Sequence, residues 1–322
     1  MQPHTDFKFH PRITQIGCYW GQGGHTELYL LEGETLALID TGVSDTPERY
    51  IAPALASIGR SLGDIGLILN THGHMDHAGG NGQIVAAAGC PVWLPADDVA
   101  IAEDPDQQFA LYFAPNEQLL GRVDRLEAAR AEFRQQAGTP VRVSRALRDG
   151  DLVDLGRGLR LRVVHCPGHT LGSSSFFWED EGILFSGDCA LGMGSRPGGF
   201  PLIYFPDLYE QSLARLLTLD LRVLCLGHHY FSRTLTRESV KYGPAARQFL
   251  SESLAIAGLI RDAVASATLA QPEADFLTVA RAALDRLEGV LSFRRDPETG
   301  LPVAGPTAAL YSNWRRYRPA GG

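Results

Sequence analysis

The sequence has few cysteines and no long apolar run. Its five cysteines are odd in number, widely spaced and without a C-x-x-C pair, which is typical of a reducing compartment rather than of a disulfide framework. The N-terminal stretch lacks the charged and apolar segments of a signal peptide. No window approaches the roughly twenty apolar residues that a membrane-spanning helix needs. We therefore expect a cytoplasmic protein without membrane association.

The sequence also lacks an excess of positive charge. A net charge of -8 argues against binding to a long nucleic acid, which needs clustered lysine and arginine. Cationic clusters occur only late, around Arg294 and Arg295 and around Arg315, Arg316 and Arg318. Such clusters are usually solvated, and a phosphate- or carboxylate-binding role is the alternative. We expect a small-molecule substrate, and the last hundred residues could form a homodimer contact.

Predicted strands and helices alternate in the first half of the chain. Residues 26–42 predict two strands joined by a turn at Gly33 to Thr35. The next segment predicts a helix that begins at Pro47 and is kinked by Pro53. Further strands are expected within residues 65–70, 91–94, 159–166, 173–180, 182–188 and 222–229, and a helix within 81–90.

Two regions are helical in propensity. Residues 97–137 interrupt the alternation and carry Phe109, Tyr112 and Phe113, which either bury against the body of the protein or cover a pocket. The last hundred residues are mostly helical, starting with the segment from Glu238. We therefore expect a domain over residues 1–230 with a helical insertion at about 97–137, followed by a helical extension over 231–322 packed on it.

The segment THGHMDH, residues 71–77, concentrates metal-binding side chains directly after an apolar strand. His72, His74 and Asp76 alternate, so an extended backbone would direct them to one side. His77 departs from that alternation. Imidazole and carboxylate are ligands that suit zinc and its neighbours. Four such groups exceed what one ion accommodates, which indicates two ions.

Three further candidates follow apolar strands and a glycine. They are His169 in PGHT, Asp188 in SGD and His228 in LGHH. A lone histidine at a strand end is more often a structural residue, and a lone SGD is usually a turn. Together with the clustered motif, however, these residues could converge at the tips of neighbouring strands.

The chain resembles the metallo-beta-lactamase superfamily over about residues 24–230. The resemblance rests on the motifs H-x-H-x-D-H, PGHT, SGD and GH in this order, together with Asp40 in LIDTG. The resemblance implies an α/β fold, an αβ/βα four-layer sandwich with metals at one edge. Asp40 would orient ligands or loop backbone. By motif position the resemblance implies one ion held by His72, His74 and His169, a second held by Asp76, His77 and His228, and Asp188 bridging both.

This ligand set implies a dinuclear metal-dependent hydrolase that uses a metal-bound hydroxide. Asp76 would hold the nucleophile by a hydrogen bond and pass a proton to the leaving group. The cofactors are expected to be two divalent ions, Zn2+ before Mn2+ or Fe. The expected substrate is a carbonyl compound, namely a lactone, a thioester or a β-lactam.

Three alternatives stay open. One is a phosphodiesterase acting on a small nucleotide or phosphoester. The others, from different classes, are an iron-dependent oxidoreductase and a ligand sensor with little turnover. Thioesterases of the glyoxalase II type usually have histidine where this chain has Gly73, which puts a glutathione thioester in doubt.

Other polar residues receive weaker assignments. Ser61 in GRSLG follows a predicted helix, so it is not a nucleophile elbow. Cys166 and Cys189 flank proposed ligands without an evident base, and free cysteine is usually a small buried hydrophobe. Two histidines are expected beside the ligands rather than among them, and one arginine could contact substrate; these are His165, His229 and Arg196.

Overall fold

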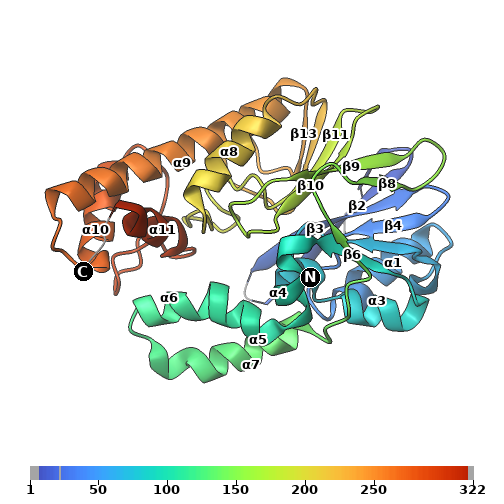
Figure 1. Ribbon diagram of the computed structural model, residues 1–322, viewed down its shortest axis with the longest axis horizontal. Helices are drawn as coiled ribbons and strands as arrows, with labels where there is room; N and C mark the ends of the chain where they lie inside the picture. Colours follow the sequence, from blue (N-terminus) through green and yellow to red (C-terminus); the bar gives the residue numbers. More distant parts are fainter. Residues whose placement is uncertain (1–6, 22, 318–322) are drawn as a thin grey trace.

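Two β-sheets lie face to face with helices on both outer sides in the computed structural model, which describes residues 7–21 and 23–317 (Figure 1). One apolar cluster joins the facing sides of the two sheets. A second cluster lies between the first sheet and its helices, and a third between the second sheet and its helices. The predicted four-layer αβ/βα sandwich is confirmed.

The strands of the first sheet lie side by side in sequence order, with antiparallel neighbours up to the fourth strand and parallel neighbours from the fourth to the seventh. Its strands are β1 (Phe7–His10), β2 (Ile13–Trp20), β3 (Gly24–Glu32), β4 (Leu36–Ile39), β5 (Leu67–Leu69), β6 (Val92–Pro95) and β7 (Arg145–Leu147). The second sheet has the order β13-β12-β11-β10-β9-β8, in which only β11 and β12 are parallel neighbours. Its strands are β8 (Leu152–Asp154), β9 (Arg160–His165), β10 (Ser174–Trp178), β11 (Ile183–Gly187), β12 (Val223–Leu226) and β13 (Val240–Tyr242).

Side-chain alternation places both faces of the first sheet in apolar surroundings. In β3, Leu28 and Leu30 belong to the cluster under the outer helices, whereas Tyr29 and Leu31 belong to the cluster between the sheets. Successive residues of a strand point to opposite faces. A nearly continuous apolar run is therefore what a strand covered on both sides requires.

The helices begin and end at recognisable residues. Pro206 and Pro244 open two of them, and Asp275 caps a third by accepting a hydrogen bond from the Thr278 amide at 2.8 Å. The helices are α1 (Ala52–Ser57), α2 (Met75–Ala78), α3 (Asn81–Ala88), α4 (Val99–Glu103), α5 (Pro105–Gln108), α6 (Ala114–Leu119), α7 (Leu126–Ala137), α8 (Pro206–Leu216), α9 (Pro244–Ala270), α10 (Phe276–Leu287) and α11 (Ala308–Tyr317).

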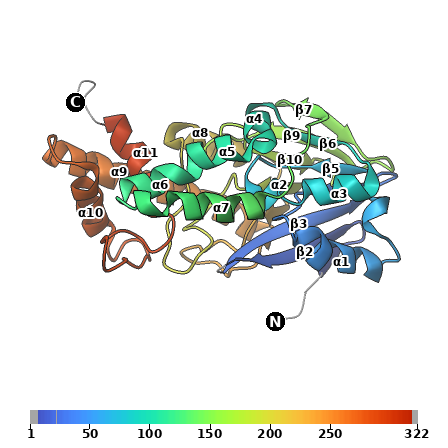
Figure 2. The same cartoon turned by 90° about the horizontal axis from the view of Figure 1, so that it is seen from below.

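The helical insertion and the C-terminal helices lie at the same end of the molecule (Figures 1 and 2). The insertion comprises α4 to α7, with a π-helical segment at Phe109–Phe113 between α5 and α6. The C-terminal helices α9 to α11 pack on one another and on α8. Both groups extend beyond the sheets.

Two segments differ in detail from the elements expected for them. The segment around Pro53 begins as a π-helix at Pro47–Ile51 and continues as α1, so the irregularity precedes the proline that cannot donate a backbone hydrogen bond. Residues 240–242, expected within a helix, form β13 instead and pair with β12. Pairing with a neighbouring strand outweighs local propensity there. This strand of the sheet lies after residue 230, the expected domain boundary.

One helix, α9, is long and apolar enough by length and composition to cross a membrane, although no sequence window suggested it. Its buried side chains, including Phe249, Ile256 and Val264, belong to the cluster shared with α8, α10 and α11. A core helix of a soluble domain passes the same test, so this helix is weak evidence for membrane insertion.

Candidate metal centre

The candidate residues follow strand ends that meet at one edge of the sandwich. Asp40 and His72 come after the parallel strands β4 and β5. Asp188 and His228 come after the parallel strands β11 and β12, and His169 follows β9, which runs in the same direction. Carboxyl ends of strands with a common direction lie at the same edge of a sheet. The short helix α2 adds Asp76 and His77 to this edge.

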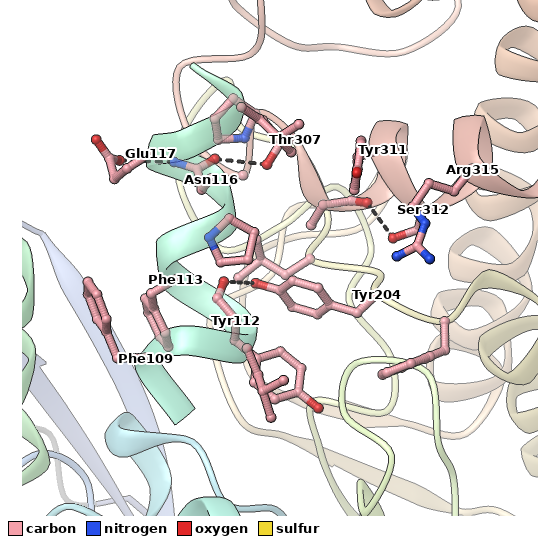
Figure 3. A pocket seen from close by; sticks show the side chains of 18 of the residues that line it. Phe109, Tyr112, Phe113, Asn116, Glu117, Tyr204, Thr307, Tyr311, Ser312 and Arg315 are labelled. Atoms are coloured by element: carbon pink, nitrogen blue, oxygen red, sulfur yellow. Dashed lines mark hydrogen bonds between the residues drawn. The ribbon is translucent and has the colours of Figure 1, made fainter. Parts of the chain in front are cut away.

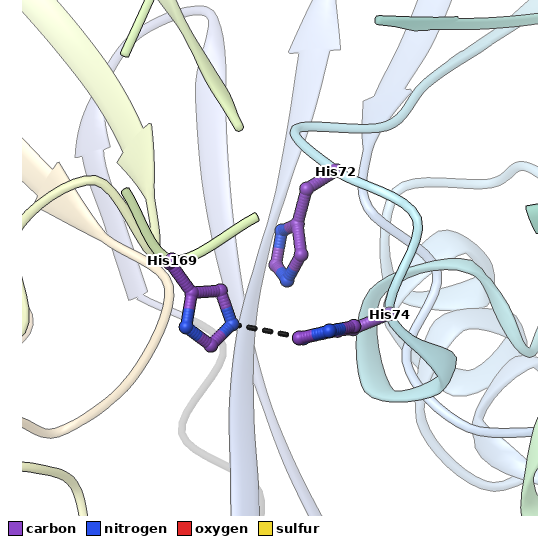
Figure 4. A group of neighbouring side chains, drawn as sticks. All are labelled: His72, His74 and His169. Carbon is purple, nitrogen blue, oxygen red and sulfur yellow. Dashed lines mark hydrogen bonds between the residues drawn. The ribbon is translucent and has the colours of Figure 1, made fainter. Parts of the chain in front are cut away.

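The structure brings all seven predicted ligand residues together. His72 and His74 from one loop and His169 from another approach one another (Figure 4). They form three overlapping groups, and in each group one potential ligand atom per residue lies within 4.8 Å of the ligand atoms of the other two residues. The groups are His72 with His74 and His169, His72 with His77 and Asp188, and Asp76 with His77 and His228. The assignment of these residues as ligands stays a prediction, and their geometry is compatible with it.

Hydrogen bonds outside the cluster fix the tautomers of three imidazoles. The Nδ1 of His77 donates to Asp40 Oδ2 at 2.8 Å, that of His169 to the Leu202 carbonyl at 2.8 Å, and that of His228 to the His25 carbonyl. A neutral imidazole that donates through Nδ1 keeps a lone pair on Nε2. The three Nε2 atoms therefore point into the cluster, where each can carry a proton or bind a cation.

Inside the cluster these nitrogen atoms lie within hydrogen-bond distance of other imidazole nitrogens. His77 Nε2 is 3.1 Å from His228 Nε2, and His169 Nε2 is 2.8 Å from His74 Nδ1. Facing lone pairs repel, so each of these contacts needs a shared proton or a nearby metal ion. Three buried atoms also have no hydrogen-bond partner, namely Nε2 of His72, Nε2 of His74 and Oδ1 of Asp188. Buried polar atoms are normally satisfied, so this donor set fits bound cations.

Charge in the cluster also favours a cation. Burial lowers the pKa of His72 and His74 and keeps both imidazoles neutral. Burial acts in the same direction on His77, but the carboxylates of Asp40 and Asp188 outweigh it and raise the pKa of His77 to about 10. Burial alone would raise the pKa of Asp188, yet the neighbouring histidines hold it well below its usual range. The anionic cluster therefore attracts a proton or a metal ion.

Two carboxylates outside the predicted ligand set hold the loops in place. Asp40 accepts hydrogen bonds from the Thr71 amide and hydroxyl, both at 2.8 Å, in addition to its contact with His77. Asp98 accepts from the Gly73 amide at 2.9 Å, the Thr170 hydroxyl at 2.6 Å and the Gly172 amide at 2.8 Å. Asp98 thus joins the loop of His72 and His74 to the loop of His169.

The sequence reasoning missed Asp98, although a signal for it was present. Asp98 follows the apolar strand β6, just as the predicted ligands follow theirs, and its side chain is buried. It lies at the start of the segment that we interpreted as an insertion. The same strand-end rule that identified the ligands therefore also identifies this supporting carboxylate.

A second missed group surrounds Glu27 beside the cluster. The buried Glu27 carboxylate lies 2.7 Å from His229 Nε2 and 3.2 Å from His25 Nε2, and it accepts from the Ser239 hydroxyl at 2.9 Å. The Glu27 amide also donates to the Gly227 carbonyl at 2.7 Å. These contacts fasten the loop that carries His228 to strand β3, and they give His229 a hydrogen-bonding role beside the cluster.

Gly73 occupies a position where a side chain does not fit. A Cβ atom there would lie 2.8 Å from Ile101 Cγ1 and 3.0 Å from the Asp98 carbonyl oxygen. Ile101 belongs to α4 of the insertion, which packs directly on the motif loop. The departure from the histidine of glyoxalase II-type motifs thus has a steric reason in this chain.

The remaining candidates make no contact with the cluster that identifies them as ligands. His165 is half-buried and its Nε2 contacts the Leu171 carbonyl at 2.8 Å, away from the ligands. Arg196 lines the cavity over the cluster, which has a volume of about 290 Å3. Cys166 and Cys189 are buried. Arg295 is paired with Asp285 at 2.7 Å; Arg318 of the last cationic cluster lies outside the described residues.

Comparison with known proteins supports the resemblance. The sequence model of the family described as "Metallo-beta-lactamase superfamily" matches residues 22–228. A hydroxyacylglutathione hydrolase from Rhodopseudomonas palustris (strain BisB18) is 29% identical over 59% of this chain and 58% of its own length. The matched part is thus little more than half of that relative. A hydroxyacylglutathione hydrolase from Hyphomonas neptunium is 30% identical over 72% of this chain and 71% of its own.

Solved structures share the fold over nearly the whole chain. A metallo-beta-lactamase family protein from Thermus thermophilus superposes with a TM-score of 0.69 at 23% identity, covering 96% of this chain and 95% of that one. A beta-lactamase domain protein from Burkholderia ambifaria gives a TM-score of 0.62 at 20% identity, covering 96% and 85%. At such identities the likeness concerns the fold.

Proposed function

Because the chain belongs to the metallo-beta-lactamase superfamily and is a metal-dependent hydrolase, we propose that it uses two divalent metal ions to cleave a carbonyl ester-type bond, that of a lactone or a thioester. The position of Asp188 carries the proposal. Its Oδ2 lies 3.4 Å from His169 Nε2, and its Oδ1 lies 3.3 Å from His228 Nε2. One carboxylate thus contacts both halves of the ligand set, as a bridging ligand does.

Residues of the chain would hold the two ions in two groups, with zinc as the first candidate because imidazole and carboxylate suit it. When bound, a pair of divalent ions acidifies a water molecule and polarises a carbonyl oxygen. The groups are His72, His74 and His169 for one ion and Asp76, His77 and His228 for the other, with Asp188 shared.

Asp76 is the residue that we assign to proton transfer. Its side chain is 17% exposed, whereas the side chains of His77 and Asp188 are 0% and 6% exposed, and it lines the cavity over the cluster. A carboxylate in this position can accept a hydrogen bond from the attacking water and pass the proton to the leaving group. The buried residues around it hold their positions and exclude water.

The cavity over the cluster favours a carbonyl substrate over a phosphodiester. Arg196 is the single cationic side chain among its lining residues within the described part of the chain. Phosphoryl groups are usually held by several arginines, lysines or metal ions.

The test combines metal analysis with a substrate panel. Protein stripped with a chelator is reloaded with zinc, manganese or iron, and turnover is measured on lactones, thioesters, β-lactams and phosphodiesters. We expect two ions per chain and the highest turnover on a lactone or thioester. Iron with oxygen consumption would support the oxidoreductase instead, and metal binding without turnover would support the sensor.

Two variants test the assignment of residues. Asp76→Ala and Asp188→Ala should each lower turnover by several orders of magnitude, on the order of 10³-fold or more, and Asp188→Ala should also lower the metal content. Both should keep the circular dichroism spectrum of the wild type. Asp180→Ala, at an exposed position, is the matched control. Near-normal turnover of either site variant would refute the two-ion assignment.

A further inference from the structure

A second and larger cavity lies between the helical insertion and the C-terminal helices (Figure 3). Its volume is about 1000 Å3, at the upper end of the range of roughly 300–1,000 Å3 typical of small-molecule sites. Phe109, Tyr112 and Phe113 of the π-helical segment line one side, Tyr204 packs on Tyr112 with the ring centres 4.9 Å apart, and Tyr311 of α11 also lines the cavity. The aromatic residues of the insertion are thus largely buried, and they also line the cavity.

Exposed leucines gather at this cavity. Leu111, Leu171 and Leu202 are 55%, 43% and 38% exposed, and all three line it. They come from the insertion, the loop after His169 and the loop before α8. Single exposed apolar residues are ordinary, but a contiguous group around a cavity marks a binding surface. The walls therefore suit an apolar ligand.

The cavity adjoins the one over the candidate metal centre. Five residues line both, namely Met75, Phe113, Leu202, Tyr204 and Gly305. The His74 ring lies 4.7 Å from the Tyr112 ring and 5.9 Å from the Phe113 ring, centre to centre. A molecule with its reacting group at the histidines can therefore extend directly along the aromatic walls.

Polar groups of the walls are already engaged near the metal centre. The Tyr204 hydroxyl donates to the Tyr112 carbonyl at 3.0 Å, so its ring faces the cavity without a free donor. At the outer end, Arg316 is paired with Asp207 at 2.5 Å. The outer end also carries Arg315 and Glu117, so the charges there are mixed in sign and do not form an anion site.

On this basis we infer that the large cavity binds a long, apolar acyl chain attached to the scissile carbonyl, so that the substrate is a long-chain acyl thioester. The inference rests on the proposed function, because the carbonyl must lie at the metal centre. The small cavity then receives the thioester group, and the insertion and α11 enclose the chain.

The test is a series of acetyl, butyryl, octanoyl and dodecanoyl thioesters of one thiol, with the zinc-loaded protein. We expect kcat/KM to rise by up to about fourfold per added methylene until the chain fills the cavity. Leu111→Glu should lower the dodecanoyl-to-acetyl ratio of kcat/KM at least tenfold. Leu269→Glu is the matched control, since Leu269 is 76% exposed and lies on α9 away from the lining residues.

A binding measurement separates this inference from the proposed function. Metal-depleted protein should bind dodecanoate in calorimetry, and Leu111→Glu should weaken that binding at least tenfold. Hydrolysis that is independent of chain length would overturn the inference and leave the hydrolase intact, whereas failure to hydrolyse any thioester or lactone would count against the proposed function. A preference for dodecanedioate that disappears in Arg315→Ala would also overturn the apolar assignment.

Discussion

Asp98 joins two loops of the candidate metal centre, so replacing it with asparagine tests whether these loops are held from outside. Its Oδ2 accepts from the Gly73 amide and the Thr170 hydroxyl, and its Oδ1 accepts from the Gly172 amide. An asparagine side chain has one acceptor oxygen. With that oxygen at the Oδ2 position, the amide NH2 faces the Gly172 N–H, so two donors oppose each other in a buried site.

The expected loss follows from these contacts. A hydrogen bond to a charged acceptor contributes about 1.5–3 kcal/mol, and an unsatisfied buried donor costs about 1–3 kcal/mol. Burial raises the pKa of Asp98, so the ionised carboxylate itself carries a desolvation cost that asparagine avoids. We therefore expect Asp98→Asn to lower the free energy of unfolding by about 1–3 kcal/mol at neutral pH.

The effect on metal binding is the decisive measurement. Because Asp98 supports His72, His74 and His169 without lying among them, its variant should bind zinc about 10- to 100-fold more weakly. Competition with a chromogenic chelator measures the affinity, and urea unfolding of the metal-free protein measures stability. Asp97→Asn is the control, since that neighbouring carboxylate is 63% exposed. Wild-type zinc affinity in Asp98→Asn would refute the positioning role.

Two further predictions concern the same edge of the sheets. At neutral pH the His77 imidazole, with a pKa of about 10, is protonated in the metal-free protein, so zinc binding should release about one proton from it. Calorimetry in buffers of different ionisation enthalpy measures this proton release. Persistence of the release in His77→Gln would contradict its assignment to His77. Gly187→Ala should destabilise the fold by about 2 kcal/mol or more, since Gly187 has a φ of +49° and a Cβ atom would lie 2.5 Å from Thr71 Oγ1. Gly243→Ala, with a φ of +50° and no neighbour within 4 Å, isolates the backbone cost, and equal melting temperatures of the two variants would exclude the clash.

Much of the site could be predicted from sequence because its residues follow apolar strands. A short apolar run identifies a buried strand, and the polar residue after it lies at the sheet edge whatever the rest of the chain does. His72, His169, Asp188 and His228 all obey this rule. Their spacing also matches a family motif, which supplied the pairing into two groups.

Features that depend on packing between distant segments could not be predicted in this way. The Glu27 carboxylate contacts His229 across some two hundred residues, and neither residue has a local signal for the other. Residues 240–242 form a strand because β12 offers an unpaired edge, which no local pattern records. The large cavity likewise exists only where the insertion and α11 face each other, so the sequence could propose a pocket but not its walls.

The charge of the buried cluster links the metal centre to the kind of substrate. Asp40, Asp76 and Asp188 bring three negative charges into a site whose other groups are imidazoles. One divalent ion would leave a negative charge uncompensated, and buried charge without compensation is costly. Two divalent ions would leave one positive charge in excess. A hydroxide ion held at the centre would balance that excess, so a neutral carbonyl compound could bind without adding charge to the site. A phosphodiester would bring a further negative charge, and among the described residues that line the cavity over the centre Arg196 is the one arginine or lysine. The charge count and the apolar cavity thus independently favour an uncharged acyl substrate.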